Sequence, residues 1–486
     1  MNFYFQAAQK TIDKKNQCDI FNAMKELNAR QKKDGMDMTT GEPFKLLVIY
    51  SFPILLGSLF QQLYNMCDTI IVGRLLGPNA LAAVGNTGPM NFLVLGFLNG
   101  MTSGFAVITA QRFGAQDSHG LRRSIAMNVI LNIASGVVIT LLACAFTMPI
   151  LKATNTPQEI IQESFDYIFV IYLGIMSMVL YNGCSCVLRA VGDSKTPLYF
   201  LVASSVLNII FDILFIAQFK MGVAGAAWAT VIAQALAGIA SFVWILIRYP
   251  ELHLSREDFS WNSKFALKHL NIGMNMGFQF SITAIGVVIL QGALNNFGPT
   301  KIAAFTAAQK VEQLVTVAAG VMGITMTNFA GQNLGAAKID RIKEGVTKSI
   351  VISVAFAIIA AILACALSDQ MTALFLDRAS MDEARWNEIL DASRTYLRIC
   401  SIFFPILFVL FIYRNTLQGV GRGFWPLMGG VFELVARTVA AYTLPAVMGF
   451  AGICTAEPLA WIAATVPLGI AYYIIMSKFR ITNTAE

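Results

Sequence analysis

The chain has 486 residues, of which 56% are hydrophobic and 13% are charged, and its formal net charge is +7. Soluble domains carry about 25% charged residues, so this composition, with its mean hydropathy of +0.63, excludes a water-soluble globular fold. The excess of Lys and Arg is therefore read as a guide to orientation in a membrane and not as a sign of a nucleic-acid partner.

Apolar stretches of about 20 residues, each long enough to cross the hydrocarbon core of a bilayer, recur along most of the chain. We predict twelve membrane-spanning helices and therefore an all-α integral membrane protein. Their approximate ranges are 46–71, 89–111, 124–149, 165–187, 197–219, 222–247, 270–293, 309–331, 347–368, 395–418, 425–448 and 452–477.

The segment before the first predicted helix, residues 1–44, is polar and rich in Lys. We expect a cytoplasmic tail without fixed structure or function; the alternative is a regulatory segment that binds anionic lipid. The remaining predicted divisions are an N-lobe of six helices (45–248), a cytoplasmic linker (249–269), a C-lobe of six helices (270–478) and a C-terminal cytoplasmic tail (479–486).

The first predicted helix contains a carboxylate, Asp68, within an apolar sequence. Ionisable groups at membrane depth are costly, which favours a functional role for this acid. Pro53, earlier in the same helix, lacks a backbone N–H and permits a bend. Gln61 and Tyr64 lie between these two residues and are candidates to line a substrate cavity.

The fifth and sixth predicted helices carry further polar groups. Asn208 precedes Asp212 by one helical turn, so both side chains lie on one helix face. At about 1.5 Å per residue, Asp212 lies about 22 Å along its helix and Thr230 about 12 Å along the next. Both fall in the outer half of the bilayer, as does Asp68. Such a set of oxygen atoms suits Na⁺, and it suits equally a proton shared by two acids.

Polar residues of the second half occur at different places. Glu312, Gln279 and Ser281 are further candidates to line a substrate cavity. Glu433 and Arg437 stand one turn apart in the eleventh predicted helix, and we expect them to pair with each other in a structural role.

One pattern is written twice along the chain. The shared elements are Gly-Pro, Ala-Ala, Gln and Gly-Ala, which begin at 77, 82, 111 and 114 and recur at 298, 303, 332 and 335, always at the same offset. A Val-Gly pair and a proline, at 191 and 197, recur at 420 and 426 with a second, slightly longer offset. Long repeats in a membrane chain are typical of transporters with two related lobes and a substrate path between them. Because six is an even number of helices, we predict two six-helix bundles related by a pseudo-twofold axis along the membrane normal.

Basic residues are concentrated in the even-numbered connections between predicted helices. By the positive-inside rule these connections, and with them both termini, are cytoplasmic in a multi-pass protein of the plasma membrane. The basic residues concerned are Arg112, Arg122, Arg123, Arg189, Lys195, Arg248, Arg256, Lys264, Lys268, Lys338, Arg341, Lys343 and Lys348.

The sequence resembles the multidrug and toxic compound extrusion (MATE) family over roughly 43–480. The resemblance is carried by Pro53, Gln61, Tyr64, Asp68, the connection 189–197 (RAVGDSKTP), Asn208 and Asp212. It implies two six-helix bundles, a central cleft, and exchange of cationic or amphipathic compounds for Na⁺ or H⁺. It also implies a cation site in the N-lobe made by Asp68, Asn208, Asp212 and Thr230, and bending of the first helix at Pro53. One branch of the family has an acid in the seventh helix, where this chain has Gln279 and Ser281, which favours the N-lobe site.

We therefore predict a secondary active efflux antiporter that exports amphipathic, often cationic, organic compounds in exchange for Na⁺ or H⁺. No Gly-x-x-x-x-Gly-Lys-Ser/Thr loop occurs in the sequence, so an ion gradient is the expected energy source. We expect a monomer in contact with lipid, without cofactor, enzymatic activity or nucleic-acid partner. The alternative is a flippase or exporter of lipid-linked or anionic amphiphiles; a channel or a membrane enzyme is less favoured.

Overall fold

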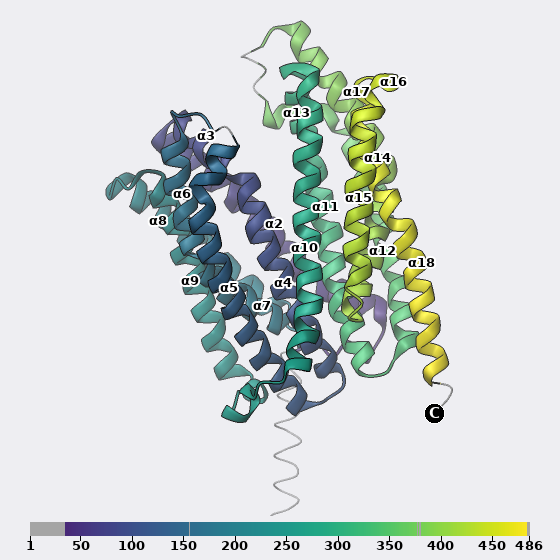
Figure 1. Cartoon of the computed structure of the whole chain (residues 1–486). Helices are drawn as coiled ribbons and strands as arrows, with labels where there is room; N and C mark the ends of the chain where they lie inside the picture. The colour runs from purple at the N-terminus through teal and green to yellow at the C-terminus, as the bar shows by residue number, and fades with distance from the viewer. Residues whose placement is uncertain (1–34, 155, 377, 379–380, 484–486) are drawn as a thin grey trace, which may run out of the picture.

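The computed structural model describes residues 35–154, 156–376, 378 and 381–483, and within them it contains helices and connections but no strand (Figure 1). The predicted all-α fold is confirmed. The first half comprises α2 (Pro43–Leu76), α3 (Pro78–Asn86), α4 (Gly88–Gly114), α5 (Ser118–Ala153), α6 (Ile161–Leu173), α7 (Ile175–Ala190), α8 (Lys195–Ile213), the π-helix η1 (Leu214–Gln218) and α9 (Gly222–Arg248).

Two short 3₁₀ turns, η2 (Pro250–Leu252) and η3 (Arg256–Phe259), connect this half to the second. The second half comprises α10 (Ser263–Leu294), η4 (Asn295–Phe297), α11 (Gly298–Gly335), α12 (Ile339–Ala366), α13 (Ser368–Phe375), α14 (Glu383–Gly419), α15 (Phe424–Thr443), α16 (Pro445–Met448), α17 (Phe450–Cys454) and α18 (Ala456–Asn483).

The described residues trace twelve membrane spans. Ten stretches are long and apolar enough to cross a membrane, and α6 with α7, which meet at 47°, form an eleventh span. One of the ten, Ser263–Gly335, has 73 residues, which would extend about 110 Å as a single helix. It contains α10 and α11, and the chain reverses between them, because the start of α10 and the end of α11 both lie beside the α4–α5 connection. Counting these two helices separately gives the predicted twelve.

The sequence repeat also appears in the backbone. Left-handed φ angles occur in matched pairs at the two offsets of the repeat. The pairs are Gly77 (92°) with Gly298 (80°), Gln116 (55°) with Ala337 (56°), Gly192 (91°) with Gly421 (77°), and Lys220 (52°) with Gly449 (57°). Non-glycine residues rarely adopt such angles, so the shared pair Gln116 and Ala337 shows the same turn built twice. Two pseudo-symmetric bundles are therefore the architecture, as predicted.

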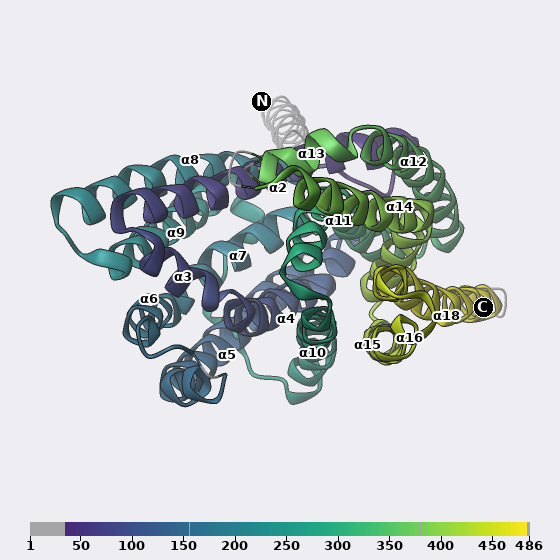
Figure 2. The same ribbon diagram turned by 90° about the horizontal axis from the view of Figure 1, so that it is seen from above.

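The two halves meet along a seam of glycines. Seen from above, α2, α4, α10 and α11 lie in the middle of the molecule (Figure 2). A Cβ added to Gly104 of α4 would lie 2.6 Å from the Cα of Gly273 in α10, and one added to Gly100 would lie 2.6 Å from the carbonyl oxygen of Met276. Glycine at these positions lets the two helix backbones touch, as small residues commonly do between membrane helices.

The helix α2 belongs to both halves. Leu47, Tyr50 and Ile54, on its first three turns, are buried in the apolar core formed by the second half. Val72, near its other end, is buried in the core formed by the first half. The predicted N-lobe of 45–248 therefore begins with a helix whose base is packed in the opposite core.

Residues 36–41, which we call the strap, run across the end of the molecule where α4 and α11 finish. The Met36 amide donates to the Gly192 carbonyl at 3.1 Å, and the Met38 amide donates to Gln332 at 2.9 Å. Lys338 and Arg341 donate to strap carbonyls. The expectation of an unstructured tail is wrong for these residues, because polar side chains of the second half bind their backbone. Residues 1–34 lie outside the described residues.

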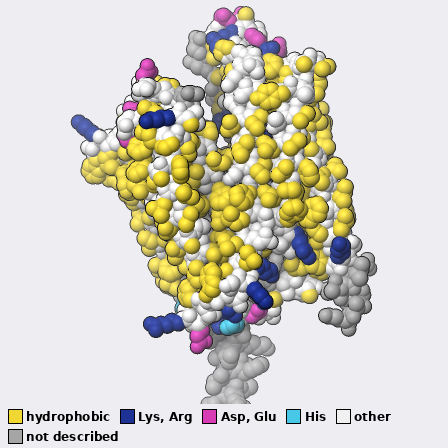
Figure 3. Space-filling view, viewed as in Figure 1, with side chains coloured by type: hydrophobic (Ala, Val, Ile, Leu, Met, Phe, Trp, Pro, Cys, Tyr) yellow, Lys and Arg dark blue, Asp and Glu magenta, His cyan; other side chains and the backbone are white. Residues whose placement is uncertain are grey.

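The surface is consistent with a membrane protein. Hydrophobic side chains cover the middle of the face shown in Figure 3, and charged side chains gather toward the two ends. Large apolar residues such as Leu141 (66% exposed) and Ile402 (73% exposed) point outward. In water such a surface would be an aggregation hazard, whereas in lipid it needs no partner.

Candidate functional site

Two carboxyl groups of the first half face each other. Asp68 lies on α2, and Asp212 lies in the last turn of α8 with no exposed surface. Their carboxyl groups are within side-chain hydrogen-bonding reach of each other. Within the described residues, both oxygens of Asp212 and one of Asp68 receive no hydrogen bond from another group. Two adjacent carboxylates repel each other, so this acid pair is suited to hold a shared proton or a bound cation.

An amide and a hydroxyl extend this polar region along α8 and α9. Asn208 lies one turn before Asp212 and donates to the Thr230 hydroxyl at 3.3 Å. The carbonyl oxygen of the Asn208 side chain is buried and receives no donor from the described part of the chain. A small pocket lined in part by Tyr64, Asn208 and Thr230 lies at this point. The structure thus brings the four predicted cation-site residues into one region, with several oxygen atoms that lack donors.

The backbone changes immediately after Asp212. The α-helical part of α8 ends at Ile213 and continues as the π-helix Leu214–Gln218. A π-helical turn shifts the backbone hydrogen bonds by one residue, and such turns occur frequently at functional sites. Asp212 therefore lies in the last turn of the regular α-helix, two residues before the π-helical turn begins.

Two tyrosines stand beside the acid pair. The phenols of Tyr64 on α2 and Tyr167 on α6 lie within electrostatic range of both Asp68 and Asp212. Tyr167 was not predicted from the sequence. Nothing in its sequence context distinguishes it from Tyr172 on the same helix, and its position depends on how α6 packs. A phenol can donate to a carboxylate, so both tyrosines can respond to the charge of the pair.

The other predicted residues of α2 have different surroundings. Pro53 is buried, and α2 remains helical through it from Pro43 to Leu76. Gln61 is exposed on the same helix. The proline therefore removes one backbone hydrogen bond at the point where α2 passes from the second core to the first.

Acids of the second half have partners. Glu312 is buried on α11 and accepts a hydrogen bond from the Tyr396 hydroxyl. Gln279 is buried on α10 and accepts from Gln418 at 2.7 Å. Ser281 is half-buried on α10. The predicted cavity residues of the two halves thus have separate environments, and their contact with substrate stays a prediction.

The expected pairing of Glu433 with Arg437 is wrong. Glu433 pairs with Arg414 of α14, and Arg437 pairs with Glu457 of α18 at 2.8 Å. The physical reason is that α15 contacts both α14 and α18, so its two charged residues pair with different neighbouring helices and not along their own helix. Glu457, at the start of α18, was not singled out from the sequence.

At the end where α4 and α11 finish, two glutamines bind the opposite halves reciprocally. Gln111 donates to the carbonyl of Gly419 at 2.9 Å, and Gln332 donates to the carbonyl of Ala190 at 2.9 Å. The two donors are related by the first offset of the sequence repeat, and the two acceptors are related by the second. We call this pair the glutamine clamp. Its two bonds therefore join equivalent positions of the repeat.

Glycines let the backbones meet at the clamp. A Cβ on Gly114 would overlap the Gln332 carbonyl oxygen, and a Cβ on Gly335 would overlap the Gln111 carbonyl oxygen. This end of the molecule is therefore sealed by direct backbone contact, and we call it the closed end. The acid pair lies nearer the opposite end, since Asp68 is in the last third of α2, whose base lies at the closed end.

A family model described as MatE matches the chain twice, over residues 53–214 and 272–443. These two matches together cover more than half of the chain and divide it at the repeat.

Similar proteins include the probable multidrug resistance protein YoeA of Bacillus subtilis, which is 25% identical over 456 residues, with 91% of this chain and 96% of that protein covered. The multidrug export protein MepA of Staphylococcus aureus is 22% identical over 450 residues, with 91% of this chain and 96% of that protein covered. Among solved structures, a MOP superfamily transporter from Pyrococcus furiosus superposes with a TM-score of 0.85 at 24% identity, over 92% of this chain and 98% of that one. This last likeness establishes a shared fold.

Proposed function

This chain belongs to the multidrug and toxic compound extrusion (MATE) family, and from that membership we propose that it exports amphipathic, often cationic, organic compounds in exchange for Na⁺ or H⁺. MATE proteins are transporters, and the chain is a multi-pass membrane protein. We further propose that it works as a monomer in the plasma membrane with both termini in the cytoplasm. The strap and the end of α18 lie at the same end of the molecule (Figure 1), which supports this orientation.

The acid pair is the observation that carries the proposal. A carboxylate in a membrane segment is costly unless it is paired, and within the described residues no cation faces Asp68 or Asp212. One bound proton or Na⁺ between them offsets their repulsion, and Asn208 and Thr230 add neutral oxygen atoms to the site. Loss of that cation leaves two negative charges that favour a different separation of α2 and α8.

In the transport cycle, binding and loss of this cation would be coupled to binding and release of the substrate. Substrate and coupling ion compete when each binds preferentially to a different arrangement of α2, because a ligand shifts an equilibrium only by its differential affinity. Bending at Pro53 would move the part of α2 that carries Asp68. At the closed end, alternating access requires the glutamine clamp to break, so that the two halves separate there and approach at the other end.

The alternative flippase of lipid-linked or anionic amphiphiles would need positive charge along its path. In the described residues the buried guanidinium groups of Arg414 and Arg437 are each paired with a glutamate. This neutralisation favours the export of cationic compounds over the alternative.

The test is transport by the purified full chain in sealed vesicles. A fluorescent organic cation is loaded, and its efflux is followed with a Na⁺ gradient, a proton gradient, both, or neither. The proposal expects efflux that stops when one particular gradient is collapsed and that is lost in D68N and D212N. Efflux that continues with both gradients collapsed would contradict ion coupling.

A further inference from the structure

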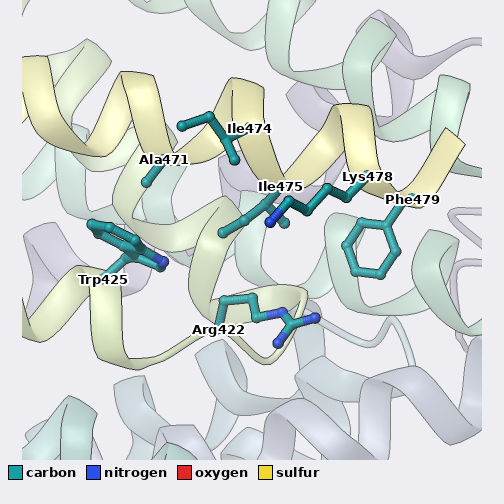
Figure 4. A pocket seen from close by; sticks show the side chains of 7 residues that line it. All are labelled: Arg422, Trp425, Ala471, Ile474, Ile475, Lys478 and Phe479. Atoms are coloured by element: carbon teal, nitrogen blue, oxygen red, sulfur yellow. The ribbon is translucent and has the colours of Figure 1, made fainter. Parts of the chain in front are cut away.

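A groove at the closed end of the second half lies apart from the acid pair. It has a volume of about 320 Å³. Arg422 of the α14–α15 turn and Trp425 of α15 form one side, and Ile474, Lys478 and Phe479 of α18 form the other (Figure 4).

The groove brings two cations together. Figure 4 shows the Arg422 guanidinium and the Lys478 side chain on the same space between α18 and the turn. The guanidinium of Arg422 lies 5.9 Å from the centre of the Phe479 ring. No carboxylate within the described part of the chain forms an ion pair with Arg422. Two cations that face one cavity repel each other, and an anion placed between them would be attracted to both.

The positions of the first half that correspond to Arg422 and Lys478 carry different residue types. The second offset of the repeat relates Asp193 to Arg422 and Tyr249 to Lys478. There the Tyr249 hydroxyl donates to the Asp193 carboxylate at 2.8 Å, and the other oxygen of Asp193 accepts from two backbone amides at the start of α8. In the first half, the donor Tyr249 and the acceptor Asp193 therefore bind each other at the position that the groove occupies in the second half. The second half has two donors there, and its described residues supply no carboxylate for Arg422.

The groove changes from apolar to cationic along α18. Ile474 is 49% exposed and lies one turn, about 6 Å, before Lys478. Trp425 is 39% exposed beside them, and tryptophan is enriched where a membrane meets water. Apolar side chains toward the bilayer and cations toward its surface match the polarity of a phospholipid, and basic pockets between membrane helices on the cytoplasmic side bind acidic headgroups.

We propose that this groove binds an anionic phospholipid. The phosphate lies between Arg422 and Lys478, and an acyl chain lies along Ile474. This site does not depend on the proposed transport mechanism.

The experiment is native mass spectrometry of the purified full chain, titrated with dioleoyl phosphatidylglycerol or dioleoyl phosphatidylcholine. The wild type is expected to retain phosphatidylglycerol in preference to phosphatidylcholine. R422Q/K478Q is expected to bind phosphatidylglycerol at least about tenfold more weakly, the loss of ~1.4 kcal/mol, and R422K/K478R is expected to retain the preference.

The matched control is R256Q/K264Q, which removes two exposed cations from the same end of the molecule. If the control and R422Q/K478Q lose phosphatidylglycerol equally, the binding reflects general charge and the proposal is wrong. A wild type without preference for phosphatidylglycerol also contradicts it. Competition by millimolar inorganic phosphate would show an anion site that does not require the lipid, which overturns the assignment. Size-exclusion profiles establish that each variant is folded.

Discussion

The two halves of the molecule share a backbone but differ in how they treat buried acids. In the first half, Asp68 and Asp212 face each other, and no cation of the described chain joins them. In the second half, Glu312, Glu433 and Glu457 are bonded to a tyrosine and two arginines. Paired acids have a fixed arrangement, whereas two facing acids without a partner would change their preferred distance if, as proposed, a cation enters or leaves. The comparison teaches that two halves with the same backbone can differ in chemistry, since only the first half has a facing acid pair without a cationic partner in the described residues.

The largest expected effect comes from neutralising the acids of the first half. D68N and D212N should each lower ion-driven efflux by about 100-fold, near the upper end of typical coupling between two sites. Vesicle efflux is the measurement, with the amount of folded protein checked by size exclusion. The matched variant of the second half is E312Q, since that acid is already hydrogen-bonded to Tyr396. Because Glu312 is also a predicted cavity residue, equilibrium binding of the fluorescent cation is measured beside efflux. Equal losses in E312Q and D212N would remove the distinction between the halves.

For the free energy of unfolding we expect the opposite order, with the larger loss in the second half. E433Q leaves the buried Arg414 guanidinium without its counter-charge and should lower the free energy of unfolding by about 3–5 kcal/mol. D212N should not destabilise the fold, because it removes a repulsion and no ion pair. Thermal unfolding in detergent measures both. The double variant R414M/E433M should recover most of the loss, and a stable E433Q would show that the pair is not structural.

The glutamine clamp is where the halves should behave alike. Q111A and Q332A each remove one clamp hydrogen bond of about 1 kcal/mol, so the clamp term should shift the balance between closed and separated arrangements at this end about fivefold in each. Q332A also removes the bond that Gln332 accepts from the Met38 amide of the strap. Distances between spin labels on α4 and α11 report the shift. Q291A is the control, because that side chain bonds to Asn295 at the far end of α10. Unequal effects of Q111A and Q332A would show that the strap, which also binds Gln332, breaks the symmetry.

The smallest expected effect belongs to Pro53. P53A restores a backbone hydrogen bond and stiffens α2, which should slow efflux about threefold, on the order of 0.6 kcal/mol in the barrier, and leave substrate affinity unchanged. Efflux rate and equilibrium binding of the same fluorescent cation separate the two quantities. If both are unchanged, the proline serves only in packing.

Much of this arrangement could be predicted from the sequence, because a charged residue inside an apolar helix is conspicuous. Asp68 and Asp212 were found in this way, and Asn208 was then indicated because it precedes Asp212 by one helical turn. Tyr167 could not be found, since tyrosine is common in helices and only the packing of α6 brings it to the acids.

Other features depend on which helices are neighbours. The spacing of Glu433 and Arg437 fits a pair along one helix, but α15 contacts two other helices that carry complementary charges, Arg414 on α14 and Glu457 on α18. The strap was missed for a different reason. Its order comes from side chains that bind its backbone, such as Gln332 and Arg341, and backbone groups carry no sequence pattern.

Because α2 packs in the cores of both halves, a rotation near its base would move its other end by a larger distance. Its base is packed in the second core by Leu47, Tyr50 and Ile54, and Pro53 lies at the upper edge of that buried segment. Asp68 stands about four helical turns beyond the proline, which is an arm of about 22 Å. With that arm, a rotation of about 10° at the proline would displace the carboxylate by about 4 Å, which is enough to separate it from Asp212. A small angular change near the closed end would thus be enough to form or break the proposed cation site, and binding of a cation there would favour the corresponding angle of α2.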